Sequence, residues 1–399
     1  MFKKSRYIFV IIFILIIAYF LLGFSNSTAI DAFAYALAIG IDESETSDLK
    51  FTFQFSKASK SSETVEGSQY IFSVDSTSLD AAISLLNNYL TKPVNLSHCK
   101  VIIISEAVAA KGIEKFISTL MNSVDIRPDT TIIISKSKGQ EFIENADAKF
   151  ETLISTYYEI ATSSNNYTSY TDYVKITDFL NSSQSFSSEP YAILGNVYDN
   201  DSENCSFGAT KVEQSQISDG SGVETLGLAV FKENKLVGEL SAIQTIAHLL
   251  ITNNLKTCIV SVENPLNRNE LVDLFLYSPS TPKISVKFIN NSPFVSVDLK
   301  IKAKILSSSS ANNLDNDYFE LISDELNKYL TDIIEDYLYT ISKEYNSDIA
   351  GIGKFAAKNF LTIDDFEDYD WLDNFEDCFF DANVDSNVIS DLLLNWQQE

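Results

Sequence analysis

The chain has 399 residues and a formal net charge of −26, from 55 acidic and 29 basic residues. A surface this acidic repels phosphate backbones, so nucleic-acid binding is excluded, and it repels anionic lipid headgroups as well. Hydrophobic residues make up 45% of the chain, which is typical of packed cores, and the length indicates two or three domains.

The first feature along the chain is an apolar segment that follows a basic start. Three of the first six residues are Lys or Arg, and residues 7–24 carry no charge and are rich in Ile, Leu and Phe. This length is sufficient for a short membrane-spanning helix, and the basic flank keeps the N-terminus in the cytoplasm. We therefore expect residues 1–24 to form an uncleaved signal anchor. Cleavage at residues 27–29 is the alternative, and it would release the protein.

Residues 25–200 are predicted to form a mixed α/β region, which can contain two subdomains. Residues 33–41 and 49–55 predict a strand pair with Phe51, Phe53 and Phe55 on one face. Two strand-then-helix units follow, and they favour parallel neighbouring strands with helices across the sheet. The elements predicted after the strand pair are a helix at 76–90, a strand at 100–105, a helix at 106–121, a strand at 130–135 and a helix at 140–145.

Residues 201–222 are polar and poor in large apolar side chains, so we interpret them as a linker to a C-terminal α+β domain at residues 223–399. This domain begins with a predicted hairpin at residues 227–241. Its turn is at Glu233-Asn234, where Asn tolerates a positive φ. We expect the hairpin to bury Val230, Phe231 and Leu236 against the next long helix or the sheet beneath it.

The remaining C-terminal elements are a short helix at 241–250, a hairpin at 283–289 and 294–305, the long helix at 315–345 and a last strand at 378–388. The long helix carries one apolar stripe, which predicts packing against a sheet. The stripe comprises Ile322, Leu326, Leu330, Ile333, Tyr337 and Ile341. The whole chain is therefore predicted to be α+β, a multi-domain mixed α/β protein with central sheets packed by helices and one N-terminal membrane-anchor helix.

No arrangement of a nucleophile, a base and an orienting group can be argued from the sequence, so we predict no catalytic, cofactor-binding or metal-binding residue. His98 flanks a buried strand and is expected to be a hydrogen-bonded structural residue. His248 has no obvious partner. The widely spaced cysteines indicate small semi-buried residues, although a disulfide is allowed outside the cytoplasm; they are Cys99, Cys205, Cys258 and Cys378.

Residues 364–373 are densely acidic and are the strongest candidate for a cation site. Clustered carboxylates suit Ca²⁺, but the spacing is not that of an EF-hand and the glycine of its sharp turn is absent. We therefore favour a solvated acidic loop with Phe366, Tyr369 and Trp371 packed inward.

The wording of the hairpin, Gly227-Leu-Ala-Val-Phe-Lys-Glu-Asn-Lys-Leu-Val-Gly-Glu-Leu240, resembles a signature of the Ger(x)C family, the C subunits of spore germinant receptors. Residues 36–42, 97–105 and 348–353 are similar to further segments of that family. The resemblance fails near the N-terminus, where the family has a lipid-modified Cys. Phe24 stands at that position, so a thioether to lipid is impossible there, and the signal anchor would replace the lipid.

The resemblance implies a non-enzymatic subunit displayed on the outer face of the inner spore membrane. It implies receptor A and B membrane subunits as partners, of which the B subunit binds the germinant, and it implies no cofactor. The alternative is an extracytoplasmic, membrane-anchored solute-binding protein or enzyme. That alternative is disfavoured because no polar residues converge on a recognisable pocket in the sequence.

Overall fold

The computed structural model describes residues 12–13, 32–56, 69–122, 125–148, 151, 153–163, 166–198, 222–277, 279–290, 292–308 and 316–390. Apart from Ile12 and Phe13, the predicted anchor lies outside the described residues, as do Phe24, the alternative cleavage site at 27–29, Cys205 and the linker up to residue 221. Within the described part of the chain, no helix is long and apolar enough to cross a bilayer.

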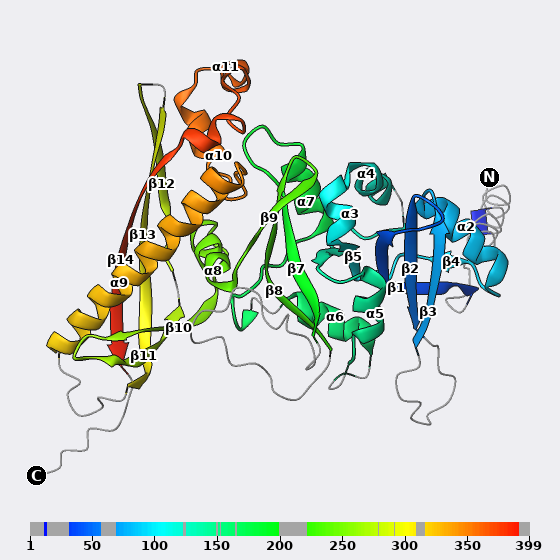
Figure 1. Ribbon diagram of the computed structural model, residues 1–399, viewed down its shortest axis with the longest axis horizontal. Helices are drawn as coiled ribbons and strands as arrows, with labels where there is room; N and C mark the ends of the chain where they lie inside the picture. Colours follow the sequence, from blue (N-terminus) through cyan, green and yellow to red (C-terminus); the bar gives the residue numbers. More distant parts are fainter. Residues whose placement is uncertain are drawn as a thin grey trace, which may run out of the picture.

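The described strands form two sheets with helices packed on them, so the fold is mixed α/β as predicted (Figure 1). The large sheet has nine described strands in the order β3-β2-β1-β5-β6-β7-β8-β9, with β4 beside β1. Its strands are β1 (Ala34–Glu43), β2 (Leu49–Ser56), β3 (Gln69–Ser76), β4 (Val94–Asn95), β5 (Val101–Ser105), β6 (Thr131–Ser135), β7 (Tyr191–Tyr198), β8 (Gly222–Lys232) and β9 (Lys235–Leu240).

The middle of the large sheet is parallel and its two ends are antiparallel. β1, β5, β6 and β7 run parallel, whereas β2 and β3 at one end and β8 and β9 at the other run antiparallel. Every residue of β5 and β6 is buried, as expected for β-branched strands covered on both faces. The strand pair at the start of the chain is confirmed, and Phe51, Phe53 and Phe55 share one core.

Helices cover both faces of the large sheet. One face carries α2 (Leu79–Tyr89), α3 (Glu106–Lys111), α4 (Glu114–Asn122) and α7 (Ile176–Ser183), and the other carries α5 (Gly139–Asn145) and α6 (Ile154–Thr162). The prediction of one helix over residues 106–121 is wrong. The chain breaks between α3 and α4 at Gly112, whose φ of 110° is incompatible with a continuous helix.

The small sheet has five described strands and packs against a long helix. Its order is β10-β11-β13-β12, and β14 pairs with β13 in parallel. Its strands are β10 (Thr257–Asn264), β11 (Asn267–Tyr277), β12 (Lys283–Ile289), β13 (Ser292–Ser308) and β14 (Phe379–Ser390). The helices around it are α8 (Ala242–Ile251), α9 (Asn316–Tyr339), α10 (Gly353–Ala356) and α11 (Ile363–Tyr369).

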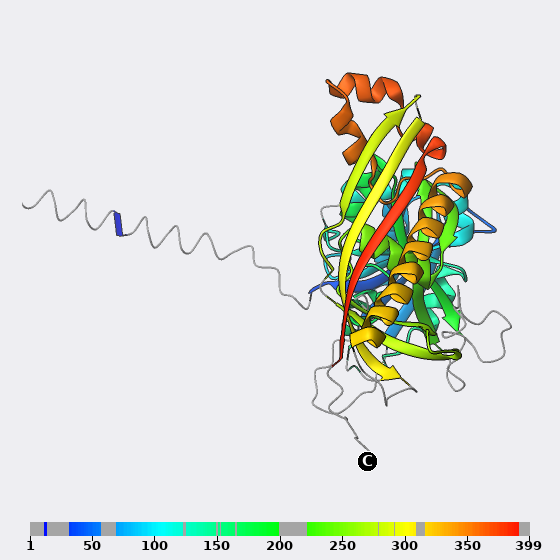
Figure 2. The ribbon, with the colours of Figure 1, turned by 90° about the vertical axis from the view of Figure 1, so that its left-hand side faces the viewer.

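The α9 helix packs against the small sheet and lies alongside β14, as Figure 2 shows. The predicted apolar stripe is confirmed except at one position, because Ile334 is fully buried and Ile333 only partly. A π-helical turn at Thr340–Glu344 follows α9 and keeps Ile341 buried. The predicted hairpin at residues 283–305 and the last strand are also confirmed.

The β8–β9 hairpin belongs to the large sheet, so this sheet includes strands from both sides of the linker predicted at residues 201–222. The division into domains at that linker stays a prediction. Its two faces lie in two different cores. Ala229 and Phe231 join the core of α2, α3 and α7, whereas Leu228 and Val230 join the core of α8 and α9. The hairpin therefore links the two sheets through alternate side chains of one strand.

Two details of the hairpin differ from the prediction. The positive φ at the turn, 55°, falls on Glu233 rather than on Asn234. Phe231 packs edge-on against Phe179 of α7, with ring centroids 5.0 Å apart, instead of against α9. The large sheet thus holds the hairpin on its Phe231 face, and α9 contributes to the core on the Val230 face.

Candidate interaction site

The two histidines lie in opposite environments. His98 is exposed, and its ring stacks on that of Tyr35 with centroids 4.3 Å apart. Its side chain makes no hydrogen bond within the described part of the chain, so stacking replaces the contact that we expected. His248 is buried on α8, and its Nδ1 lies 2.7 Å from the hydroxyl of Tyr337 on α9. Tyr337 is therefore the partner of His248 that was not obvious from the sequence.

Burial, more than any charge, sets the state of His248. Desolvation lowers its pKa to about 4, although the nearby Asp172 carboxylate acts in the opposite direction. The hydroxyl of Tyr191 donates to Asp172 at 2.9 Å, and the Tyr191 ring packs edge-on against His248. The imidazole is consequently neutral at physiological pH, and the cluster joins β7, α8 and α9 at the junction of the two sheets.

The carboxyl ends of the parallel strands are where open α/β sheets usually bind ligands. Asp42, at the end of β1, is buried and accepts hydrogen bonds from the backbone N–H groups of Gly139 and Gln140 at 2.6 and 2.9 Å. These donors form the N-terminus of α5, which would otherwise attract an anion. The side chain of the protein itself therefore occupies this position.

A second buried carboxylate organises the turn that follows α9. Asp348 accepts hydrogen bonds from the N–H groups of Ile352 and Gly353 at 3.0 and 2.7 Å, and from the indole of Trp371 at 2.8 Å. Burial raises the pKa of Asp348 to about 6, and the three donors oppose that rise. This glycine-containing turn, which the resemblance singled out, is thus held by an internal carboxylate.

The acidic segment lies close to this turn. Phe366 and Trp371 are buried and Tyr369 is partly buried, so the inward packing predicted for them is confirmed. The Asp and Glu side chains around them are exposed. Among the described residues, no three Asp, Glu, His or Cys side chains form a group suited to a metal ion.

The described cysteines lie in the interior. Cys99, Cys258 and Cys378 are buried thiols, and Cys99 donates weakly to the carbonyl of Val101 at 3.4 Å. Burial raises the pKa of Cys99 to about 12, and it also raises that of Cys378. Thiols of this kind are poor nucleophiles, which agrees with the structural role predicted for them.

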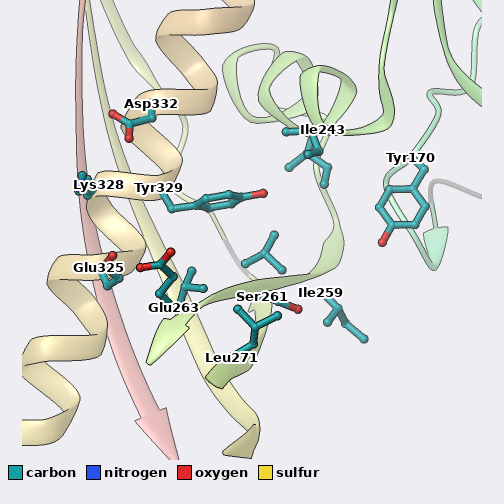
Figure 3. Close-up of a pocket in the computed structure, with 13 residues that line it drawn as sticks. Tyr170, Ile243, Ile259, Ser261, Glu263, Leu271, Glu325, Lys328, Tyr329 and Asp332 are labelled. Atoms are coloured by element: carbon teal, nitrogen blue, oxygen red, sulfur yellow. The ribbon is translucent and has the colours of Figure 1, made fainter. Parts of the chain in front are cut away.

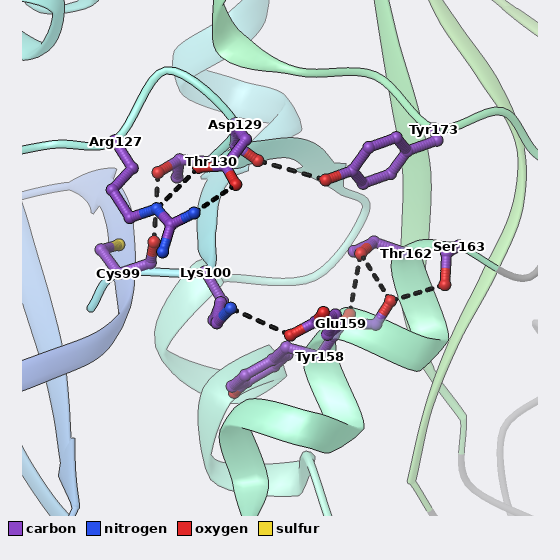
Figure 4. Close-up of polar contacts among 10 residues, drawn as sticks. All are labelled: Cys99, Lys100, Arg127, Asp129, Thr130, Tyr158, Glu159, Thr162, Ser163 and Tyr173. Atoms are coloured by element: carbon purple, nitrogen blue, oxygen red, sulfur yellow. Dashed lines mark hydrogen bonds and ion pairs between the residues drawn. The ribbon is translucent and has the colours of Figure 1, made fainter. Parts of the chain in front are cut away.

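A polar network ties the starts of β5 and β6 to α6 and to the segment before α7 (Figure 4). Lys100 pairs with Glu159 at 2.9 Å, and Arg127 makes two hydrogen bonds to Asp129 at 2.7 and 2.9 Å. The Arg127 hydrogen bonds lower the pKa of Asp129. The hydroxyl of Tyr173 also reaches the carbonyl of Asp129, at 3.3 Å. All of these contacts join parts of the same chain at its surface, so we interpret the network as structural.

A groove of ≈ 490 Å³ lies between α9, α8 and the side of β10 away from β11 (Figure 3). We call it the β10 groove. In Figure 3 the ring of Tyr329 projects from α9 into this space, with Ile243 of α8 above it and Ser261 of β10 below it. Residues of the β10 groove are Tyr170, Ile243, Ile246, Ile259, Val260, Ser261, Val262, Glu263, Leu271, Glu325, Lys328, Tyr329 and Asp332.

The β10 groove is apolar on its floor and charged at its rim. Ile259 and Leu271, which both line the groove, are 49% and 48% exposed, and adjoining exposed apolar side chains are typical of surfaces that bind a partner. Sequence analysis did not find this groove. The alternation along β10 and β11 leaves Ile259 and Leu271 on the outer face, and that was the one available signal.

Comparisons with known proteins cover nearly the whole chain. Residues 26–195 match the family described as "Spore germination protein N-terminal domain", and residues 226–391 match "Spore germination B3/ GerAC like, C-terminal". The spore germination protein GerQC of Bacillus cereus is 20% identical over 385 residues, which cover 94% of this chain and 97% of that protein.

One further relative and one solved structure are also similar to this chain. A protein of Bacillus subtilis (strain 168) described as "Putative spore germination protein YfkR" is 21% identical over 318 residues, which cover 77% of this chain and 75% of that protein. The crystal structure of the GerBC protein matches with a TM-score of 0.50 and 15% identity, over 88% of this chain and 96% of that chain. At this identity the structural match supports the fold alone.

Proposed function

This chain belongs to the Ger(x)C family of spore germination proteins, and from that premise we propose that it is the C subunit of a nutrient germinant receptor complex. The observation that carries the proposal is the order of the two family matches, at residues 26–195 and 226–391, which together span both sheets. The partners would be the receptor A and B membrane subunits.

We propose further that the subunit is non-enzymatic and acts by contact. Support comes from the groups that could do chemistry. His248 is buried and neutral, Asp42 and Asp348 cap backbone N–H groups, and Cys99 is a buried thiol with a raised pKa. Each of these groups has an internal structural role, whereas the β10 groove offers an apolar surface suited to a partner.

The subunit would stand on the outer face of the inner spore membrane, with residues 1–24 as an anchor whose N-terminus is cytoplasmic. The basic start and the apolar segment of the sequence support this arrangement. Metabolic labelling with a fatty-acid analogue should leave the protein unlabelled, since Phe24 cannot carry a thioether. It should still sediment with membranes and resist carbonate, and recovery of a soluble form beginning near residue 30 would contradict the anchor.

Deletion of the gene tests the receptor role. Spores should lose their response to one class of nutrient and still germinate through stimuli that bypass receptors. Immunoblots of the same spores should show reduced A and B subunits, because members of an obligate complex are degraded without their partners. Unchanged nutrient responses together with unchanged subunit levels would overturn the proposed function.

A further inference from the structure

Two edges of the small sheet are closed by side chains of neighbouring helices. On β14, the backbone N–H of Ala382 donates to Glu335 of α9 at 3.3 Å, and that of Ser386 donates to Asn327 at 2.8 Å. On β12, the Asn359 amide donates to the carbonyl of Val286 at 3.1 Å. An unprotected edge strand is a template for pairing with another chain, so these contacts suppress that pairing.

The third edge, on β10, has one such side-chain contact at its start and is open along Ile259 and Ser261. Among the described strands, β10 pairs with β11 alone. The hydroxyl of Ser169 donates to the carbonyl of Thr257 at 2.7 Å, from the side away from β11. Because alternate residues of an antiparallel strand face the same side, Ile259 and Ser261 direct their backbone groups to this open edge. Within the described part of the chain, no backbone hydrogen bond reaches either of them from that side.

The open edge borders the β10 groove, so backbone and side-chain recognition coincide. An added strand would bond to the backbone of Ile259 and Ser261, and its alternate side chains would meet the apolar floor formed by Ile246 and Tyr329. This combination is the one used in β-augmentation, where main-chain bonds supply affinity and the pockets supply specificity.

The charge of the rim identifies the kind of segment. Glu263, Glu325 and Asp332 face the groove with one cation, Lys328, which leaves a balance of 1 − 3 = −2. Carboxylates at the rim favour Lys and Arg on the partner. A second copy of this chain is disfavoured as the occupant, because each copy carries a net charge of −26.

We propose that the β10 groove receives an extended segment of a partner subunit, with alternating apolar and basic residues, as an added strand on β10. This inference rests on the proposed function, which supplies the partner. The inference goes beyond the proposed function because it assigns the binding surface on this chain, the extended conformation of the partner segment and the positive charge of that segment.

Site-specific photo-crosslinking of the full-length protein in sporulating cells tests the location. A benzoylphenylalanine at position 259 should crosslink to an A or B subunit, within a segment that carries Lys or Arg beside apolar residues. The matched control is the same probe at Asp381, which is exposed on the outer face of β14, and it should give no such product. A subunit crosslink from 381 and none from 259, or a crosslink to a second copy, overturns the proposal.

Paired substitutions test the mechanism. Ile259→Pro removes the outward N–H and leaves the bonds between β10 and β11 in place, so it should disrupt assembly more than Ile259→Ala. The double variant Glu263→Lys with Asp332→Lys should lower recovery of partner subunits by about tenfold or more, because it presents cations to a basic segment. Asp381→Lys is the charge control and should have no effect.

The outcomes separate this inference from the proposed function. If deletion of the gene abolishes a nutrient response but all groove variants assemble and germinate normally, the groove proposal fails and the receptor role stands. If deletion has no effect on nutrient responses or subunit levels, the receptor role fails. The groove variants could instead assemble normally but bind a small apolar solute less tightly than the parent does. That result would make the groove a solute site and would overturn the proposed added strand.

Discussion

The Nδ1 atom of His248 lies 2.7 Å from the hydroxyl oxygen of Tyr337, and this bond joins α8 to α9 at the junction of the two sheets. Both residues are fully buried. A charged imidazole is strongly disfavoured here, and desolvation accordingly lowers the pKa of His248 to about 4.

The first prediction concerns pH. The pKa of His248 is about 4 in the folded state and has the ordinary value of 6.5 in the unfolded chain. Unfolding at a pH between 4 and 6.5 is therefore accompanied by uptake of a proton. Its stabilising contribution is complete above pH 6.5 and is lost as the pH falls towards 4. The stability advantage of the parent over His248→Phe should therefore shrink by roughly 3 kcal/mol between pH 7 and pH 4.

Urea unfolding of the parent and of His248→Phe over a pH series measures this difference. Comparison with a variant cancels groups of opposite sign, such as Glu189, whose pKa burial raises to about 7. Tyr337→Phe removes the same hydrogen bond but keeps the titrating ring, so it should retain the parental pH dependence. Parallel curves for the parent and His248→Phe would contradict the prediction.

The second prediction concerns the turn held by Asp348. In Asp348→Asn an amide N–H₂ replaces one acceptor and faces groups that donate, the N–H of Gly353 and the indole of Trp371. We expect a loss of roughly 2–4 kcal/mol in the free energy of unfolding. Denaturation followed by tryptophan fluorescence measures it. The control is Asp370→Asn, at an exposed residue with φ 54° that Asn also adopts, and it should stay within about 0.5 kcal/mol.

The third prediction concerns the hairpin core. Phe231→Ala should lower the free energy of unfolding by roughly 3–5 kcal/mol, because a fully buried ring is removed. A double-mutant cycle with Phe179→Ala should give a coupling of about 0.5–1.5 kcal/mol for the edge-on pair. Phe186→Ala, at a residue 62% exposed, is the control. A stable Phe231→Ala protein that fails in assembly would instead assign this residue to a partner interface.

The fourth prediction compares two glycines of the same strand. At Gly227, φ is 85° and an added Cβ would lie 2.2 Å from the carbonyl oxygen of Leu240. Gly227→Ala should therefore destabilise the protein by more than about 2 kcal/mol. At Gly222 an added Cβ meets no atom within 4 Å, so Gly222→Ala should change stability by less than about 0.5 kcal/mol. Thermal unfolding of the two variants side by side is the measurement, and equal stabilities would refute the explanation.

Local patterns predicted most of the strands and helices. The β-branched runs of β5 and β6, the alternation of β14 and the Phe51–Phe53–Phe55 face are short-range signals, and burial follows from them directly. The break at Gly112 could also have been predicted, since an isolated Gly weakens a helical pattern.

Contacts between residues far apart in the chain could not be predicted from local sequence patterns. Tyr337 lies 89 residues from His248, and Gly139 lies 97 residues from Asp42, so no local spacing reveals either pair. The choice between Ile333 and Ile334 is ambiguous because neighbouring positions at the border of a helical stripe differ by one 100° step. The β10 groove depends on where α9 comes to lie beside β10, which is a property of the assembled fold.

The place of β8 and β9 in the large sheet has consequences for folding during synthesis and for the design of chimeras between relatives. β7 is complete at residue 198, but its antiparallel neighbour β8 spans only residues 222–232. A nascent chain therefore carries an unpaired β7 edge, open to aggregation, until β8 has emerged about 34 residues later. For the same reason, chimeras of two relatives joined between residues 199 and 221 would build one sheet from two parents. A junction after Leu240 would keep that sheet intact.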